Sequence, residues 1–241
     1  MKNIAAMIQK SWIEDASLGV INVKRDTRAK HLILRTNGGK AAVTAPPGTP
    51  DREIRAFIGQ YRDKLEELIR QHRPRILLPD YEIRTDLFRL SFEEGTEKRF
   101  LARSQPGRLS IIYPPGTDFH DENLQQWLRK AIEKALAKNA RLLLPPRLKA
   151  LAGRHRLDYA QVRITTSKGR WGSCSARKHI NLSCYLLLLP AHLIDYVMLH
   201  ELAHTKEMNH GTGFWRLLDS LADGKALCLR RELRTYRTEL P

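Results

Sequence analysis

The sequence has few cysteines and no long apolar run. Its three cysteines, Cys174, Cys184 and Cys228, are odd in number and form no CxxC pair, which argues against a disulfide framework or a cysteine-based zinc site. The longest aliphatic run surrounds residues 186–189, whereas a membrane span needs roughly 20 apolar residues. The first ten residues also lack the apolar core of a secretory signal. We therefore expect a cytoplasmic protein with no membrane partner.

Acidic residues are scarce relative to basic ones. The 241 residues include 42 Lys and Arg against 26 Asp and Glu, which gives a formal net charge of +16 at pH 7. The segment 141–180 is the most basic, with ten Lys or Arg residues and a single acid, Asp158. Such a segment attracts nucleic acid or nucleotides, or it forms a solvated surface that keeps the protein soluble. The hydrophobic content of 42% is typical of a globular chain and excludes a disordered one.

The hydrophobic periodicity predicts two successions of strands, each followed by a helix. Short β-prone runs between residues 18 and 49 precede an amphipathic helix over 51–72. A second β-rich stretch over 81–113 precedes a helix over 121–142. Pro145 and Pro146 are expected to interrupt that helix, because an interior proline removes a backbone donor and clashes with the preceding turn. The remaining expected elements are a short helix over 147–154, strands over 159–166 and 179–184, and helices over 191–206 and 212–222.

These elements predict the α+β class, with no internal repeat apparent and no glycine-rich signature of a nucleotide-binding fold. We divide the chain into an N-terminal extension (1–17), a β-rich portion with helices (18–118) and a second portion (119–241) that carries the motif described next. One continuous domain over 18–241 is the alternative.

The second portion contains the sequence His200-Glu201-Leu202-Ala203-His204. Two histidines four residues apart on a helix lie on the same face, so both imidazoles can reach one metal ion. Glu201 is adjacent, where it can take a proton from a metal-bound water without being a ligand. The pattern predicts a catalytic metal site.

A third ligand has two candidates. His210 stands ten residues after His200, the spacing of the third ligand in the HExxHxxGxxH zinc site. Glu207 occupies the place of the glycine in that motif, and on a continuing helix it shares the face of the two histidines. We favour His210, because Asn209-His210-Gly211 is typical of a helix exit, with the turn made at Asn209.

Three protein ligands with one open position describe a catalytic Zn²⁺ site, one ion per chain. Hydrolysis would also need a donor to the developing oxyanion. The candidates for that donor are Arg170, Tyr185, Tyr196 and Asn209, among which the sequence does not choose.

Several segments stand in a fixed order around the motif: Arg170-Trp171-Gly172-Ser173-Cys174, Ile180-Asn181-Leu182, Ile194-Asp195-Tyr196-Val197, the HExxH segment itself, Asn209-His210-Gly211 and Phe214-Trp215. In this order they resemble the YgjP-like metallopeptidase family, a zincin-type family related to the WLM and SprT-like groups, and the likeness extends in outline from about residue 18. The resemblance implies a zincin-like catalytic portion in which His200, His204 and His210 bind zinc and Glu201 is the catalytic acid/base.

The leading hypothesis is therefore a zinc metallopeptidase that acts on a peptide or protein substrate. Arg170 and Trp171 are candidates for the wall of the substrate cleft, with core packing as the alternative for Trp171. Asn209 is a candidate for orienting a ligand. Two other functions use the same site: a metal-dependent nucleotide pyrophosphatase that holds its triphosphate through segment 141–180, and a DNA-associated protease of SprT-like type. A metal-binding module without catalysis is a further alternative.

Overall fold

The computed structural model describes residues 9–37, 39–71, 75–238 and 240. Its contacts divide the chain into two compact units, Met1–Arg75 and Ile76–Leu240. Both units contain strands and helices, which confirms the α+β class. No helix in the described ranges combines the length and the apolarity that crossing a membrane requires. Residues 1–8 of the predicted extension and residue 72, at the end of the predicted first helix, lie outside the described residues.

The first unit is a four-stranded sheet followed by two helices. The strands run in the order β1-β2-β4-β3. Alternate strand residues such as Ile21 and Val43 are buried with Ile54 and Leu65 of the helices, which gives the unit its own core. The elements are β1 (Gln9–Asp15), β2 (Gly19–Arg25), β3 (Ile33–Asn37), β4 (Lys40–Ala45), α1 (Asp51–Gln60) and α2 (Arg62–Gln71).

Two sequence predictions for this unit are corrected. β1 lies within the predicted N-terminal extension, yet it pairs antiparallel with β2 along its whole length. The single helix predicted over 51–72 is two helices, because Tyr61 leaves helical geometry (φ −112°, ψ 16°) and its N–H bonds to the carbonyl of Ile58, three residues back. A pattern of apolar spacing does not register such a tightened turn.

The second unit begins with a sheet of the same topology. Its strands run in the order β5-β6-β8-β7, and the outer pairs are antiparallel while the central pair is parallel, as in the first sheet. The strands are β5 (Ile83–Arg84), β6 (Arg89–Glu94), β7 (Leu101–Gln105) and β8 (Arg108–Tyr113).

The connection after the last strand is also repeated. The sequence Pro-Pro-Gly-Thr occurs at 46–49 and again at 114–117. In both copies the glycine has a positive φ (80° and 70°), and the threonine hydroxyl donates to the carbonyl of the first proline (3.0 and 2.6 Å). The chain therefore contains an internal structural repeat that sequence analysis did not detect.

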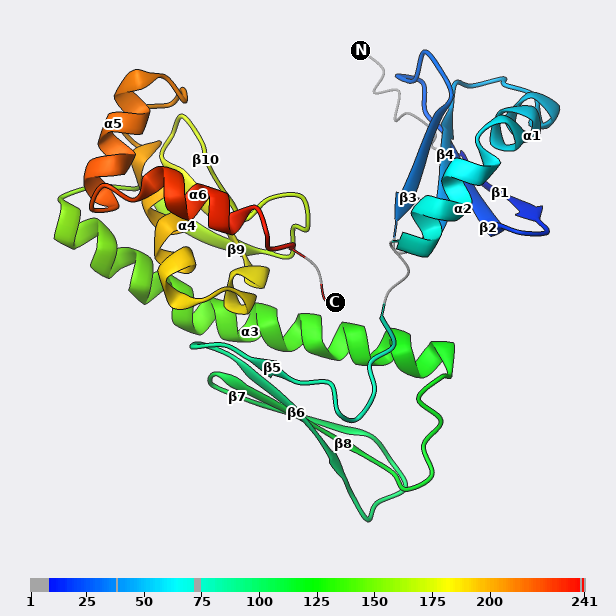
Figure 1. Ribbon diagram of the computed structural model, residues 1–241, viewed down its shortest axis with the longest axis horizontal. Helices are drawn as coiled ribbons and strands as arrows, with labels where there is room; N and C mark the ends of the chain where they lie inside the picture. Colours follow the sequence, from blue (N-terminus) through cyan, green and yellow to red (C-terminus); the bar gives the residue numbers. More distant parts are fainter. Residues whose placement is uncertain (1–8, 38, 72–74, 239, 241) are drawn as a thin grey trace, which may run out of the picture. The chain divides into compact units, whose positions relative to one another are not determined.

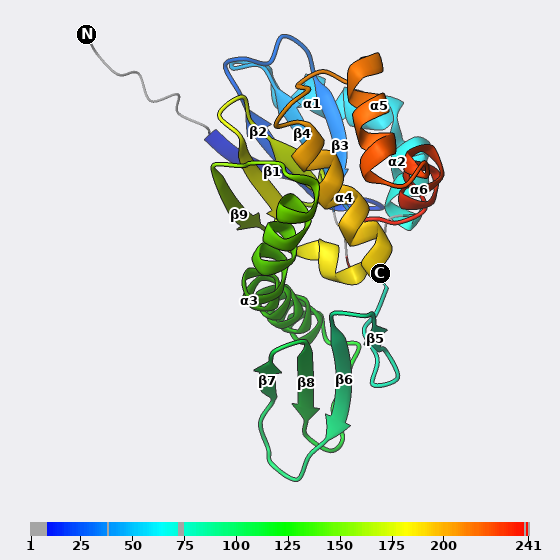
Figure 2. The same ribbon diagram turned by 90° about the vertical axis from the view of Figure 1, so that its left-hand side faces the viewer.

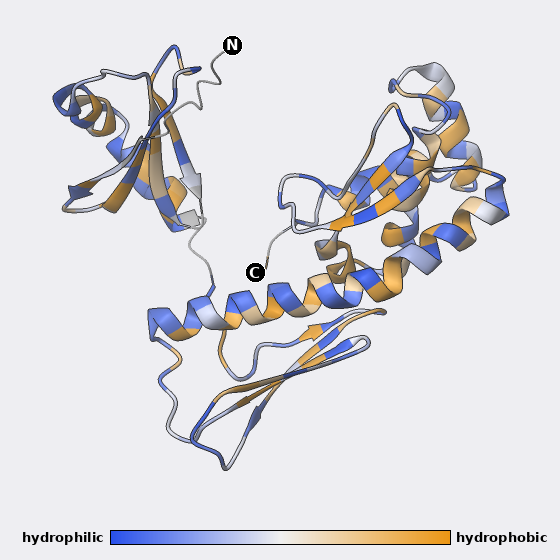
Figure 3. Ribbon diagram, turned by 180° about the vertical axis from the view of Figure 1, so that it is seen from behind, coloured by the Kyte–Doolittle hydropathy of each residue, from blue (hydrophilic) through white to orange (hydrophobic). Residues whose placement is uncertain are grey.

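Helix α3 (Glu122–His155) is the longest element and forms the centre of the second unit. In Figures 1 and 2 it lies between the sheet β5–β8 and the C-terminal elements. Buried residues along it, such as Ile132, Leu144 and Leu148, contact both layers of one continuous core. Figure 3 shows the matching alternation of apolar and polar residues along this helix.

The predicted interruption of this helix at Pro145 and Pro146 is wrong, since α3 continues through both residues. The prolines leave the carbonyls of residues 141 and 142 without helical partners. Arg141 and Leu142 are exposed, while Leu144 and Leu148 are fully buried. Apolar burial on the inner side holds the helix together across the two prolines.

The remaining elements surround the predicted site. Strand order β10-β11-β9 places β10 at the edge of a three-stranded sheet. The helix predicted over 191–206 ends earlier, and the last helix and the edge strand were not predicted. The elements are β9 (Gln161–Thr165), β10 (Gly172–Cys174), β11 (His179–Ser183), the 3₁₀ helix η1 (Cys184–Leu188), α4 (Ala191–Ala203), α5 (Thr212–Leu221) and α6 (Ala226–Leu233).

Helix α4 is tied to both layers of the second unit. Arg147 of α3 donates to both carboxylate oxygens of Asp195 (2.5 and 2.8 Å). Asp86, in the turn between β5 and β6, accepts from the backbone N–H of Ala191 at the start of α4 (2.7 Å). The sheet β5–β8 therefore shares a compact unit with α4, and the two units divide after Arg75 and not at the predicted boundary near 118.

The ion pair between Arg147 and Asp195 supports a prediction about stability. Because both side chains are about one-third exposed (29% and 32%), a double-mutant cycle with Arg147→Met and Asp195→Asn is expected to give a coupling energy of about 1 kcal/mol. Urea unfolding of the two single variants and the double variant measures it. Lys149→Met, an exposed change on the same helix, is the control. Strict additivity would show that the pair does not hold α4.

Candidate metal centre

Three histidines meet at the C-terminal end of α4. One ring nitrogen of each of His200, His204 and His210 lies within 4.8 Å of the others. His200 is on the last turn of α4, His204 is the residue that caps it, and His210 follows in the loop before α5. The structure thus brings together the three residues that the spacing selected.

The loop between the second and third histidines starts earlier than predicted. Helix α4 ends at Ala203, and not near residue 206 with a turn at Asn209. Thr205 explains the early end, since its hydroxyl and its N–H both bond to the carbonyl of Leu202 (2.7 and 3.0 Å). These bonds satisfy a carbonyl that the helix would otherwise leave open.

Hydrogen bonding orients the imidazoles. Nδ1 of His204 lies 3.0 Å from the carbonyl oxygen of Glu207, and because a carbonyl only accepts, Nδ1 carries the proton and Nε2 keeps its lone pair. Nε2 of His200 and Nε2 of His210 lie 3.2 Å apart. Burial lowers the pKa of His200 to about 3, and burial with the neighbouring His204 lowers that of His210. Neutral imidazoles with converging nitrogens are metal donors.

Phe214 and Trp215 fix the position of the third histidine. The Phe214 ring is fully buried, and its centre lies 4.9, 4.5 and 4.7 Å from the imidazoles of His200, His204 and His210. Trp215 lies 6.0 Å from His210, ring centre to ring centre. The first turn of α5 therefore forms the apolar floor under the three imidazoles.

Glu207, the alternative third ligand, points elsewhere. A Cβ placed on Gly213 would lie 3.2 Å from Cδ of Glu207, so this carboxylate lies against the start of α5. Its backbone carbonyl supports His204, as described above. Within the described residues, the group of metal-binding side chains contains His210 and not Glu207. The geometry favours His210 of the two candidates.

Glu201 lies beside the triad in an unusual environment. It is 5% exposed, and its Oε2 has no hydrogen-bond partner among the described residues. Burial raises its pKa to about 8, with the charge of Arg170 acting in the opposite direction. A Cβ on Gly172 would lie 2.6 Å from Oε1 and 2.8 Å from Cγ of Glu201. The absence of a side chain at residue 172 therefore makes the space that this carboxylate occupies.

A pocket of about 390 Å³ opens next to Glu201. Its wall includes three predicted site residues, Arg170, Trp171 and Tyr196, together with His200 and Glu201. Trp171 also packs against the core. Burial raises the pKa of Tyr196, which keeps its hydroxyl protonated. The pocket residues that sequence analysis missed come mainly from α6 and the segment after it: Arg230, Leu233, Arg234 and Tyr236.

Two predicted residues lie elsewhere. Tyr185 is fully buried and its hydroxyl donates to Glu133 of α3 (2.5 Å). Asn209 is an exposed loop residue whose carbonyl accepts from the N–H of Gly211 (2.8 Å). Neither is among the described residues that line the pocket. The basic residues of segment 141–180 are spread over α3, β9 and the loops between α3 and β11, and Arg170 is the one that lines the pocket among the described residues.

The residues present fit a divalent cation such as Zn²⁺. Three imidazole nitrogens are a typical protein ligand set of a catalytic zinc site. Glu201, whose Oε2 is buried and has no partner among the described residues, lies beside them.

Comparison with known protein families identifies the family of this chain. The family described as YgjP-like, metallopeptidase domain, matches residues 30–236. Neither a curated protein nor a solved structure gives a significant match to the chain.

The two candidates for the third ligand make different predictions for metal binding. His210→Ala is expected to weaken Zn²⁺ binding by at least about 100-fold, because it removes one of three nitrogen donors. Glu207→Gln keeps the carbonyl that supports His204 and is expected to leave the affinity nearly unchanged. Titration of the metal-free variants against a chromophoric chelator measures both. A larger loss for Glu207→Gln would assign the third ligand to Glu207.

Proposed function

Because the chain belongs to the YgjP-like metallopeptidase family, we propose that it is a Zn²⁺-dependent metallopeptidase in which Glu201 is the general base. The observation that carries this proposal is the buried carboxylate of Glu201, whose Oε2 has no partner among the described residues, beside three converging imidazoles. The family supports the hydrolysis of peptide bonds and a peptide or protein substrate.

His200, His204 and His210 would hold the ion. A bound Zn²⁺ supplies a Lewis acid that polarises the substrate carbonyl and lowers the pKa of a coordinated water towards ~7. Glu201 accepts the proton of the attacking water and returns it to the leaving amine. Its Oε2 is available for this transfer, because no described group competes for it. Gly172 and the apolar part of α4 hold the carboxylate in place.

The edge strand β10 offers a place for the substrate backbone. It pairs only on its β11 side in the described sheet, and its first residue, Gly172, touches the side chain of Glu201. An extended peptide that adds to this edge would carry its backbone past Glu201. Tyr196, one helical turn before His200, is the neutral donor that fits a developing oxyanion best among the predicted candidates.

Glu201→Gln tests the proposed base. The amide keeps the size of the side chain and leaves the three imidazoles unchanged, so Zn²⁺ content is expected to match that of the wild type. Peptide hydrolysis is expected to fall by about 10²–10⁴-fold, because the general base is lost. Metal analysis and cleavage of a quenched fluorescent peptide library measure the two quantities. Glu207→Gln, a nearby exposed carboxylate, is the control. Undiminished hydrolysis in Glu201→Gln would disprove the mechanism.

Gly172→Ala tests the space that the structure reserves for the carboxylate. The added methyl group displaces Glu201, so kcat is expected to fall by at least about tenfold while Zn²⁺ still binds, since the ligands lie on other elements. Gly169→Ala is the control, because a Cβ there meets no atom within 4 Å. Circular dichroism verifies that both variants fold. A Gly172→Ala enzyme with wild-type kcat would show that the position of Glu201 is not critical.

A further inference from the structure

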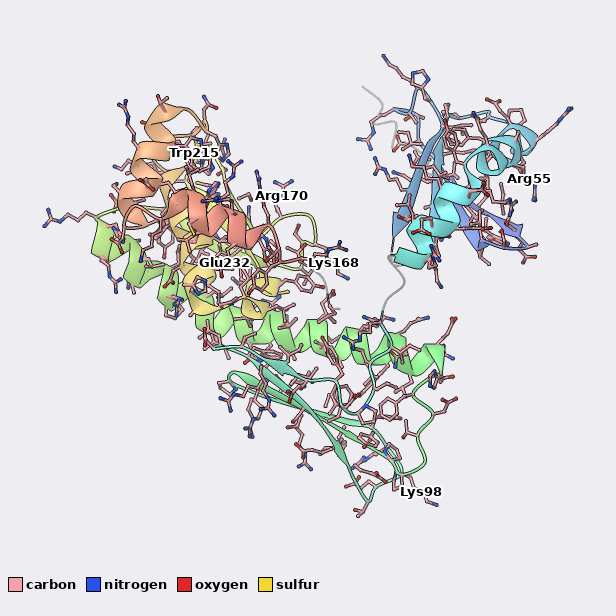
Figure 4. All side chains as sticks on the ribbon, in the orientation of Figure 1. Arg55, Lys98, Lys168, Arg170, Trp215 and Glu232 are labelled. Atoms are coloured by element: carbon pink, nitrogen blue, oxygen red, sulfur yellow. The ribbon has the colours of Figure 1, made fainter. Side chains whose placement is uncertain are left out.

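We infer that the pocket beside Glu201 binds a carboxylate of the peptide substrate, next to the bond that is cleaved. The inference rests on the proposed peptidase function and specifies its substrate class. Three arginines, Arg170, Arg230 and Arg234, line this pocket, and Glu201 is the single acidic residue in its described wall. Figure 4 labels Arg170 with Trp215, Lys168 and Glu232 around α6.

The three arginines differ from other arginines of the chain in their bonding. Arg147 is bound to Asp195 and Arg62 to Asp15. Within the described ranges, the side chains of Arg170, Arg230 and Arg234 form no ion pair and no hydrogen bond. All three are exposed at the pocket. Guanidinium groups without an internal carboxylate are available to an anion from outside.

Arg230 is held in place without losing its donors. Its guanidinium carbon lies 4.8 Å from the centre of the Trp215 ring. A guanidinium group stacked on an aromatic face can still donate hydrogen bonds, because its N–H groups point outward in its own plane. Trp215 in turn lies beside His210. The stacking therefore connects the position of one pocket arginine to the metal centre.

The remainder of the wall favours a carboxylate on a peptide over the phosphates of a nucleotide. Trp171, Val197 and Leu233 provide apolar surface, which suits the methylene groups of an amino-acid residue. A triphosphate site typically uses glycine-rich backbone N–H groups. Gly172 is the one glycine in the described wall, and the space over it is filled by Glu201. A volume of about 390 Å³ is at the small end of ligand pockets.

The carboxylate has two possible sources, an acidic side chain or the C-terminus of the substrate, and one peptide series distinguishes them. The peptides are quenched fluorescent substrates with an otherwise uncharged sequence. In each one, a single position near the cleaved bond carries Glu, Gln or Lys. Each is made with a free C-terminal acid and with a C-terminal amide. Wild-type enzyme loaded with Zn²⁺ is expected to show a kcat/KM about tenfold higher for Glu over Gln at one position, or for the acid over the amide.

Variants assign the preference to the pocket. Arg234→Met and Arg230→Met are expected to reduce that preference to near unity, because each removes a guanidinium group that would bind the carboxylate. Arg231→Met, on the same helix but outside the pocket wall, is expected to keep it. Cleavage without any acid preference, or a preference that survives in both pocket variants, would overturn the inference while leaving the peptidase intact.

A binding measurement separates this inference from the proposed function. Calorimetry with the Glu201→Gln protein and the preferred and neutral peptides reports the carboxylate contribution without turnover. If wild type cleaves no peptide, the proposed function fails, and carboxylate-dependent binding still decides the inference. Tighter binding of nucleoside triphosphate than of any acidic peptide, lost in Arg230→Met and Arg234→Met, would assign the pocket to phosphate and overturn it.

Discussion

Burying the carboxylate of Glu201 costs free energy, and the packing of the C-terminal part of the second unit must offset that cost. A buried polar atom without a partner costs about 1–3 kcal/mol, and Oε2 of Glu201 is such an atom among the described residues. Apolar packing of α4 offsets that cost, since residues such as Leu193, Met198 and Leu202 are fully buried. The glycine at 172 then supplies space for the carboxylate but no donor side chain. The arrangement preserves a carboxylate, the proposed general base, that ordinary core packing would have paired or replaced.

The scaffold around this site is built on α3. The helix contacts the sheet β5–β8 on one side and α4 with η1 on the other. Two of its polar residues fix those contacts: Arg147 binds Asp195 of α4, and Asn139 accepts from the N–H of Gly107 in the turn between β7 and β8 (2.6 Å). A break at the prolines would have separated Asn139 from Arg147. Continuity of α3 thus sets the position of α4 relative to the repeated sheet.

Local spacing made the centre of the site predictable, whereas tertiary contacts determined the rest. The three histidines and Glu201 follow from residue offsets along one helix and its exit, which a sequence displays directly. Helix α6 is only eight residues long and was not predicted, so Arg230 and Arg234 carried no signal of their place in a pocket. The path of α3 through two prolines depends on burial by distant residues. The internal repeat is visible in the sequence as the second Pro-Pro-Gly-Thr. The strands of the two copies otherwise share a similar burial pattern, as β4 and β8 do.

Part of the positive charge of the chain lies near Glu201, on the three arginines of the pocket. A guanidinium bonded directly to this carboxylate would stabilise its charged form and weaken it as a base. Arg170 acts on Glu201 through its charge, yet no hydrogen bond joins them within the described residues. Arg230 is instead stacked on Trp215, and Arg234 caps the end of α6. Positive charge can therefore attract an anionic substrate to the pocket without an ion pair to the proposed base, as long as Arg230 stays stacked on Trp215 and no arginine side chain bonds to Glu201. The aromatic floor that positions His210 and the stacking that positions Arg230 use the same residue, Trp215, so the geometry of the metal centre and the charge of the pocket depend on one side chain.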